Sequence, residues 1–467
     1  MAEAIPPQTR RKSSLLWVLA GSAAFAALVF GTIGYLYFHD DPPPDDADLR
    51  VASPLVPDDQ NGERVFEGMT KDQFAFIDYA KAHDVDDLSA QKILAGEMAD
   101  DTLVAGYLAQ VQSLMASAAA AVAQPVFEFS HPIGELLLPE ISPYMGYGRA
   151  LVLTAHQAET HGDYETAVQQ IIQLRQLAAR VAESHGPILE VLTATALEGM
   201  AEQAAIRLLN NPATSNRALE SLLQIFQREG NFVPAYQQAF RLEYQFFIFN
   251  LDSHLKNPGS LAKLARTNDN WFFHLLAADI KPHQTMRLAA DATHAAISAA
   301  VLDYATMTRQ FPTLFHSDRS QWSYVDLFLP NGGGWFFFRI TTIPLEGILT
   351  LKLTTDAHIR QLQAALALRH YFADHQSLPA TLADLVPKYL PAIPLDPFNS
   401  QPLLFDPARG LVYSVGTSLK DNGGSKFLKI AKDSPNYDDP LSDKEQPTLQ
   451  LEFQKPPPKN DSVSPAN

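Results

Sequence analysis

Cysteine is absent from this 467-residue chain. Its absence excludes catalysis by a thiolate, zinc sites built on cysteine, and disulfide bonds. It does not assign a compartment, because a chain of this length can form two or three domains with cores large enough to need no disulfides.

Positive charge is also scarce. The chain has 35 lysine and arginine residues against 52 aspartate and glutamate residues, which gives a formal net charge of −17. Such a chain repels a phosphate backbone, and no local cluster of basic residues offsets the repulsion. The composition therefore predicts that nucleic acid is not a partner.

Signatures of catalytic sites are missing as well. His156, Glu159 and His161 lie close in the sequence, but they lack the two histidines four residues apart that a zinc-protease helix requires. The glycines at 332–334 lack the Lys-Ser/Thr of a phosphate-binding loop and are not expected to open a helix. No Gly-x-Ser-x-Gly elbow occurs. An enzyme is therefore the less favoured class, and no catalytic residue is predicted.

Residues 13–38 contain no lysine, arginine, aspartate or glutamate. About 20 apolar residues in a helix cross the hydrocarbon core of a bilayer, so this segment predicts a single transmembrane helix. Trp17 and Tyr35 lie towards its ends, where aromatic rings favour the interface. Basic residues precede the segment, which predicts that residues 1–12 are cytoplasmic and that the remainder lies outside the cytoplasm.

Other interpretations of this segment are a cleaved signal peptide ending at Ala26, a twin-arginine signal, and a buried core helix. The apolar run continues for twelve residues beyond Ala26, which a cleaved peptide does not need. We therefore expect an integral protein of the bacterial inner membrane, with its C-terminal bulk in the periplasm.

Proline and aspartate dominate residues 39–61, including three consecutive prolines at 42–44. Proline does not continue a helix and the carboxylates repel one another, so this segment predicts an extended, disordered spacer. The tail at 440–467 is also predicted to be disordered.

A mainly α-helical body is predicted for residues 62–343. Apolar side chains recur at three- and four-residue steps, and a capping box starts at Thr70. One segment around Gly162 resembles a tetratricopeptide hairpin, although an ordinary antiparallel helix pair is the favoured interpretation. The predicted helices are 101–124, 143–161, 164–184, 187–209, 216–228, 234–256 and 282–310.

Two parts of the helical body could bind a ligand, a bilayer or a partner. Aromatic residues between Tyr236 and Leu251 form a stripe that is typical of a core, with a groove for an acyl or peptide ligand as the alternative. The bulky run at 335–340 follows a loop predicted to be flexible. It is interpreted as a buried strand, or else as a surface that lies on the bilayer or on a partner.

Residues 344–439 predict a small α+β module. A long helix at 344–373 ends before Leu378-Pro379, a short helix covers 381–385, and two short strands at 402–405 and 411–415 form a hairpin. Asp396 is expected to bind nearby backbone N–H groups in a turn.

Several short signals in this module follow one another in a fixed order. They are Leu378-Pro379, Leu-Ala-Asp-Leu at 382–385, Pro-Leu-Asp-Pro-Phe at 394–398, Tyr-Ser-Val-Gly at 413–416 and Asp-Asn-Gly-Gly at 421–424. This series resembles the C-terminal region of the major pseudopilins of type II secretion systems. A similar tail occurs on uncharacterised membrane-anchored bacterial proteins.

The resemblance implies an α+β fold and an envelope location for the module. In pseudopilins the loop after the Ser-x-Gly strand binds calcium, which implies Ser414, Asp421, Asp438 and Asp439 as candidate calcium ligands here. The alternative is a plain glycine-rich turn, and no other cofactor is expected. The apolar segment lacks the pilin glutamate and a long body follows it, so a filament subunit is not expected.

The function expected from these features is that of an interaction or scaffold component of a secretion or envelope assembly. Its expected partners are the membrane, through the N-terminal helix, and envelope proteins. The alternatives are an envelope hydrolase whose site is assembled by the fold, and a binder of an acyl or peptide ligand between helices.

Overall fold

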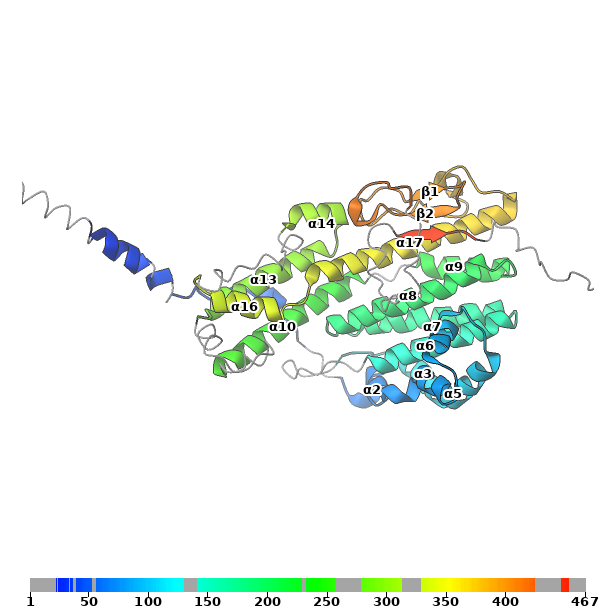
Figure 1. Ribbon diagram of the computed structural model, residues 1–467, viewed down its shortest axis with the longest axis horizontal. Helices are drawn as coiled ribbons and strands as arrows, with labels where there is room; N and C mark the ends of the chain where they lie inside the picture. Colours follow the sequence, from blue (N-terminus) through cyan, green and yellow to red (C-terminus); the bar gives the residue numbers. More distant parts are fainter. Residues whose placement is uncertain are drawn as a thin grey trace, which may run out of the picture. The chain divides into compact units, whose positions relative to one another are not determined.

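The computed structural model of the chain is mainly helical, and its described residues include three short strands (Figure 1). The predicted mainly helical class is confirmed. The residues that the structure describes are 22, 24–32, 34–36, 39–52, 56–129, 141–228, 232–257, 279–312, 329–424 and 447–452.

The chain divides into two compact units, each built from three separate segments. These boundaries differ from the predicted ones, because most of the body shares a unit with the C-terminal module. Unit 1 comprises Met1–Ala47, Phe247–Ala292 and Asp318–Ile343. Unit 2 comprises Asp48–Phe246, Thr293–Ser317 and Pro344–Asn467.

Most of the described helices belong to unit 2. They are α2 (Glu63–Glu67), α3 (Phe76–Lys81), α4 (Asp87–Ala95), α5 (Asp101–Val122), α6 (Ser142–Thr160), α7 (Tyr164–Glu183), α8 (Ile188–Asn210), α9 (Asn216–Gln227), α14 (Tyr304–Gln310) and α17 (Leu345–His375). Unit 1 contains α16 (Gly332–Thr341), while α10 (Val233–Lys256) and α13 (Pro282–Ala299) contribute residues to both units.

Local capping explains where many helices begin. The capping box predicted at Thr70 is present at the start of a short 3₁₀ helix, Lys71–Phe74. Asp163 accepts a bond from the Thr166 backbone N–H at 3.1 Å and so starts α7. The predicted helix 282–310 is instead two helices, because Asp303 caps α14 in the same way, through the Thr306 N–H.

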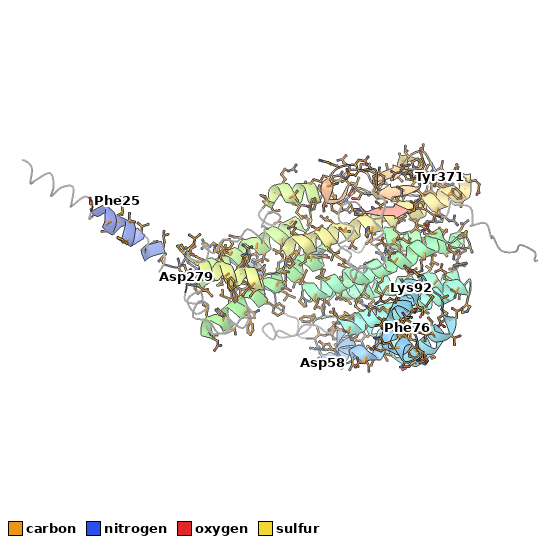
Figure 2. All side chains as sticks on the ribbon, in the orientation of Figure 1. Phe25, Asp58, Phe76, Lys92, Asp279 and Tyr371 are labelled. Carbon is orange, nitrogen blue, oxygen red and sulfur yellow. The ribbon has the colours of Figure 1, made fainter. Side chains whose placement is uncertain are left out.

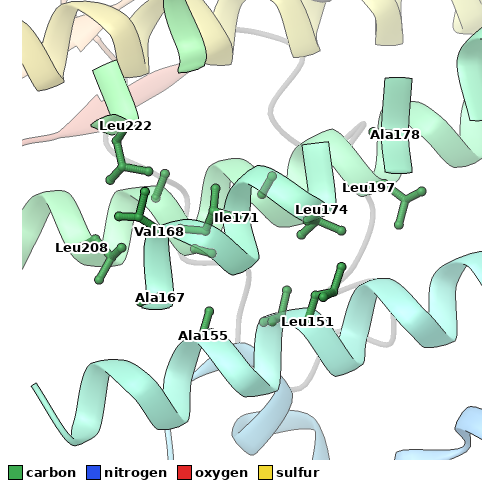
Figure 3. Packing of buried hydrophobic residues seen from close by; sticks show 14 of the residues in the cluster. Leu151, Ala155, Ala167, Val168, Ile171, Leu174, Ala178, Leu197, Leu208 and Leu222 are labelled. Atoms are coloured by element: carbon green, nitrogen blue, oxygen red, sulfur yellow. The ribbon is translucent and has the colours of Figure 1, made fainter. Parts of the chain in front are cut away.

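The core of unit 2 is built around α6, α7 and α8 (Figure 3). Figure 3 shows Ala155, Ala167 and Ala178 among larger side chains such as Leu151 and Ile171. Small residues let helix axes approach closely, and the larger ones fill the space between them. The turn between α6 and α7 contains Gly162 at φ +74°, a conformation that glycine adopts without strain.

The long helix α17 confirms the prediction for 344–373 and packs against both α8 and α9. Its Gln363 side chain donates to the Phe226 carbonyl at 2.7 Å. Gln361 donates to the Pro447 carbonyl, also at 2.7 Å, beside the sheet. The predicted α+β module is therefore continuous with the helical core of unit 2.

The sheet of unit 2 contains β1 (Leu404–Asp406), β2 (Leu411–Tyr413) and β3 (Thr448–Gln450), in the order β1-β2-β3. All neighbours are antiparallel, with Phe405 opposite Val412 and Val412 opposite Leu449. The predicted hairpin is confirmed. The predicted disorder of 440–467 is wrong at 447–452, where β3 pairs with β2 and Leu451 is fully buried.

The predicted transmembrane segment 13–38 is described only in part. Residues 24–32 and 34–36 are helical. Phe25, Leu28 and Phe30 are each about two-thirds or more exposed. In the part of the chain that the structure describes, α5 is the one helix long and apolar enough to cross a membrane. Its Tyr107 and Val111 are buried in the core of unit 2.

The predicted extended spacer at 39–61 differs from the structure. In unit 1, Asp40 accepts hydrogen bonds from the first turn of α13, through His283 N at 2.9 Å and Gln284 N at 3.1 Å. In unit 2, Leu49 is fully buried, and the Gln245 side chain donates to the Val51 carbonyl at 3.0 Å. The described residues of this segment are therefore folded against their own units.

The bulky run at 335–340 is helical and belongs to α16, so the predicted strand is wrong. The glycines form its first turn, which corrects the expected flexible loop. A Cβ atom at Gly334 would lie 2.1 Å from both the Asn331 Oδ1 and the Thr285 Oγ1, so only glycine permits this approach to α13. Phe337 is fully buried, whereas Trp335 and Ile340 are exposed.

Candidate functional site

Ser414, the first candidate calcium ligand, is fully buried just after β2. Its hydroxyl donates to Asp396 Oδ1 at 2.8 Å and accepts from the Gly416 N–H at 2.9 Å. Asp396 also accepts from the Phe398 and Val415 N–H groups, which confirms the predicted turn. Ser414 therefore belongs to a closed hydrogen-bond network that fixes the end of the hairpin.

Asp421 lies in the exposed loop that follows. Its Oδ1 accepts from the Tyr413 hydroxyl at 3.2 Å and from the Gly423 N–H at 2.8 Å. Asp438 and Asp439 lie outside the described residues. Among the residues that are described, no group of three or more His, Asp or Glu side chains could hold a metal ion. The calcium site stays a prediction.

Unit 2 contains a buried carboxyl centre that the sequence interpretation missed. We use this name for Glu63 at the start of α2, Glu190 in the first turn of α8, Tyr144 on α6 and Ser184 just after α7. The Tyr144 hydroxyl donates to Glu63 Oε1 at 3.2 Å. The Ser184 hydroxyl donates to Glu190 Oε2. All four side chains are buried.

The backbone around this centre is held by Asn61, which is fully buried. Its Oδ1 accepts from Glu63 N at 3.2 Å and from Glu128 N at 2.9 Å, while its Nδ2 donates to the Glu128 carbonyl at 2.6 Å. Opposite, a Cβ atom on Gly186 would lie 2.1 Å from Glu190 Oε2, so the turn before α8 lies directly on this carboxyl group.

Burial controls the protonation of both glutamates. It raises the pKa of Glu63 to about 9, with a further increase from the nearby charge of Glu190. Burial also raises the pKa of Glu190 to about 8. Both carboxyls are therefore protonated and neutral at pH 7.

One oxygen of each carboxyl group remains without a hydrogen-bond partner among the described residues. These atoms are Glu63 Oε2 and Glu190 Oε1. Two neutral carboxyl groups with spare acceptors can hold and exchange protons. At 2% and 0% exposure, however, neither group can be reached by a substrate in this conformation.

His156, Glu159 and His161 do not form a metal site. Glu159 accepts from Asn211 Nδ2 at 3.1 Å and lies 3.6 Å from the Arg207 guanidinium. Burial and the charge of Arg207 lower the pKa of His156 to about 3, so its ring is neutral at pH 7. His161 is exposed at the end of α6. A cation such as Arg207 beside His156 disfavours a second cation there.

A buried ion pair, also unpredicted, links α7 to α8. Arg175 Nε donates to Glu198 Oε2 at 2.9 Å, and both side chains are at least nine-tenths buried. The Arg175 guanidinium lies 4.4 Å from the centre of the Phe226 ring and donates to the Ile225 carbonyl. Arg175 therefore joins α7, α8 and α9 through polar contacts within the core.

A sequence signal for these buried glutamates does exist. Helix α8 carries Glu190 and Glu198 among apolar residues on every side, and a charged side chain in such a helix is buried with the rest. Glu63 has no comparable signal, because α2 has only five residues. Its environment depends on residues far away in the sequence.

The aromatic stripe between Tyr236 and Leu251 is part of the core. Tyr236, Phe240 and Tyr244 are at most 2% exposed. The Tyr236 hydroxyl lies 2.9 Å from Thr195 Oγ1 and so has a hydrogen-bond partner on α8. These three residues therefore lie in the core, as the favoured interpretation predicts, and the ligand groove stays a prediction.

Comparison with other proteins adds no further information on function. No protein-family model, no curated protein and no solved structure matches this chain.

Proposed function

We propose that this chain is a single-pass protein of the bacterial inner membrane. Its body would lie outside the cytoplasm and act as an interaction or scaffold component of a secretion or envelope assembly. The observation that carries the proposal is the N-terminal helix, which leaves Leu28 and Phe30 uncovered. Phe25 on the same helix is also uncovered (Figure 2). Large contiguous apolar surfaces of this kind belong in a membrane or an interface.

The N-terminal helix belongs to unit 1 and is held there by a side chain of the same unit. The ammonium group of Lys281 donates to the Leu36 carbonyl, in the last described turn of the helix. A cation at a helix C-terminus satisfies unpaired carbonyls and is favoured by the helix dipole. Asp40 then caps α13 only four residues further along the chain. This connection supports an anchor that holds unit 1 close to the bilayer.

The location of the groups with shifted pKa values favours a scaffold role over an enzymatic one. Perturbed pKa values are typical of active sites when the groups line a cleft. Here Glu63, Glu190 and His156 have strongly shifted pKa values, and Glu63 and Glu190 are buried inside a helical core while His156 is partly buried. Their burial favours a structural role.

Extraction of membranes with alkaline carbonate tests the anchor. The wild-type chain should stay in the membrane pellet, and its full release would overturn the proposal. Replacing both Phe25 and Leu28 by arginine should release it, because each arginine at the centre of a membrane helix costs about 2.5–3.5 kcal/mol on insertion scales. The matched control is Leu88→Arg, at an exposed leucine of unit 2, which should leave retention unchanged.

Affinity purification from gently solubilised membranes tests the scaffold role. We expect envelope proteins to be recovered with the full-length chain and to be lost when the body is deleted behind the anchor. Protease added outside spheroplasts should digest the body if it lies in the periplasm. Recovery of no partner protein would remove the support for a scaffold, while leaving the anchor intact.

A further inference from the structure

Exposed large apolar side chains are concentrated on unit 1, even outside its N-terminal helix. Unit 1 is much the smaller of the two units in its described residues, yet it carries as many of these side chains as unit 2. On unit 1 they are Phe249, Leu255, Leu329, Trp335 and Ile340. On unit 2 they are Leu88, Met98, Val301, Leu395 and Leu419.

Helix α16 is fixed within unit 1 by its first turn. Asn331, immediately before α16, accepts through Oδ1 from the Lys281 N–H at 2.8 Å and from Thr285 Oγ1 at 3.1 Å. Asp279 accepts from the Gly332 N–H at 2.8 Å, at the start of α16 (Figure 2). The anion-binding end of the helix is therefore occupied by a residue of this chain.

Lys281, one of these residues, also contacts the N-terminal helix. Lys281, whose backbone binds Asn331, also binds the Leu36 carbonyl through its side chain. Asp41 forms an ion pair with Arg287 on α13 at 3.4 Å. Trp335 lines the same shallow hollow as Asp41 and Arg287. Trp335 of α16 thus lies near Asp41, five residues after Leu36 of the N-terminal helix.

The two sides of α16 differ in what covers them. Phe337 is fully buried and packs against Phe247, with ring centres 5.4 Å apart, and against His254, also at 5.4 Å. Trp335 and Ile340 are 46% and 40% exposed. At about 100° per residue, Trp335 and Ile340 border one exposed arc of about 140° that also carries Arg339. A short helix with one packed side and one exposed amphipathic side is suited to lie in the plane of a membrane interface.

We propose that α16 lies in the headgroup region of the bilayer, with Trp335 and Ile340 inserted among the lipids. This inference rests on the proposed membrane anchor. A bilayer is the occupant because Lys281, whose backbone binds the residue before α16, also binds Leu36 of the N-terminal helix. The indole ring of tryptophan prefers the level of the headgroups. Unit 1 then has two membrane contacts, the anchor and α16.

The absence of cysteine makes a direct test possible, because one introduced cysteine gives a unique attachment site for a fluorescent probe. The full chain is reconstituted in vesicles of phosphatidylethanolamine and phosphatidylglycerol. Test positions are Trp335→Cys and Ile340→Cys. Leu88→Cys and Val301→Cys are matched controls at exposed apolar positions of unit 2, and Phe25→Cys reports on the anchor.

Two quenchers distinguish water from lipid. At positions 335 and 340 we expect quenching by iodide to be several-fold weaker than at 88 and 301, and quenching by nitroxide-labelled lipids to be several-fold stronger. Circular dichroism should show the same helix content in all variants. The second test position keeps the proposal testable if replacement of Trp335 impairs folding.

The remaining outcomes each overturn the inference in a different way. If position 25 is protected by lipid while 335 and 340 are as accessible to iodide as 88, the anchor stands and α16 does not contact lipid. If position 25 is itself accessible to iodide, the anchor fails and the inference fails with it. If 335 and 340 are shielded from both quenchers, protein rather than lipid covers α16.

Discussion

Glu190 and Glu198 lie on the same helix, α8, and both are buried, yet their environments differ. Glu198 binds the Arg175 guanidinium at 2.9 Å. Glu190 binds the Ser184 hydroxyl, and burial raises the pKa of Glu190 to about 8. Burial raises the pKa of both carboxyl groups, but at Glu198 the charge and hydrogen bonds of Arg175 oppose the rise, whereas at Glu190 only the hydrogen bond from Ser184 does.

The difference shows two solutions to the same physical problem. An isolated charge in the interior of a protein costs far more than any single hydrogen bond returns. A cation and further hydrogen bonds can offset the desolvation of a carboxylate, as Arg175 does in part at Glu198. Otherwise it takes up a proton, as at Glu190. The two sites should therefore respond differently to mutation and to pH.

The largest effect is expected from removing the cation. Arg175→Met should lower the free energy of unfolding by about 3–5 kcal/mol, because Glu198 is left buried without its partner. Equilibrium denaturation of the full chain in detergent, followed by circular dichroism, measures the change. The double variant Arg175→Met with Glu198→Leu should recover much of the loss. No recovery would mean that the contacts of Arg175 with Ile225 and Phe226 are the more important ones.

The second prediction concerns the proton bound to Glu190 and its effect on stability at different pH values. The folded-state pKa of Glu190 is raised, so the unfolded chain releases this proton first as pH rises. The bound proton stabilises the folded chain fully below about pH 4.5. Between about pH 4.5 and pH 8 this stabilisation decreases by about 1.4 kcal/mol per pH unit. Glu190→Gln should flatten this slope when denaturation is repeated across that range. The exposed Glu183→Gln is the control and should leave the slope unchanged.

His156 should show the opposite sign. Its folded-state pKa is lowered to about 3, so its contribution to stability is present above about pH 6.5 and is lost as pH falls. Between pH 6.5 and pH 5 we expect a loss of about 2 kcal/mol, which His156→Gln should remove. The exposed His161→Gln provides the matched control. Equal slopes in both variants would show that His156 is not buried in its neutral form.

A smaller effect should come from the turn beside Glu190. Gly186→Ala places a Cβ atom against Glu190 Oε2 and should cost about 1 kcal/mol, at the low end for overpacking, because a carboxyl group can shift. Gly199→Ala is the contrasting variant, since it has free space on α8 and should stabilise the helix slightly. Thermal melting separates the two, and equal effects would contradict the close approach at Gly186.

Asp421 extends the comparison to an exposed carboxylate. If the predicted calcium site exists, calcium at about five times its dissociation constant should stabilise the fold by about 1 kcal/mol. Melting temperatures with calcium and with a chelator measure the difference. Asp421→Ala should abolish it, while Asp406→Ala, at an aspartate held by Arg409, should not. No difference in the wild-type chain rejects the site.

Local patterns were sufficient for much of the fold. Periodic apolar residues and capping side chains gave most helix bounds to within two residues, because these signals act over one or two turns. The Asp396 turn and the hairpin of β1 and β2 are also local, and both are confirmed. The pattern failed at α16, whose glycines and aromatic residues suggest a loop and a strand when read without α13.

Local sequence patterns did not predict which individual polar groups are buried. The sequence does not bring Glu63 and Glu190 together, because 126 intervening residues separate them along the chain. The pairing of β3 with β2 likewise depends on contacts between distant segments. Such contacts form only when the helices pack.

The sequence by itself determined the helical class, the positions of most helices and the apolar character of the N-terminal segment. These properties follow from side-chain size, polarity and spacing along a few turns. Tertiary structure alone decided which buried carboxyl groups have a cation beside them, which hold a proton, and which side of α16 remains uncovered. Those outcomes depend on desolvation and on partners, and both are set by packing between segments far apart in the chain.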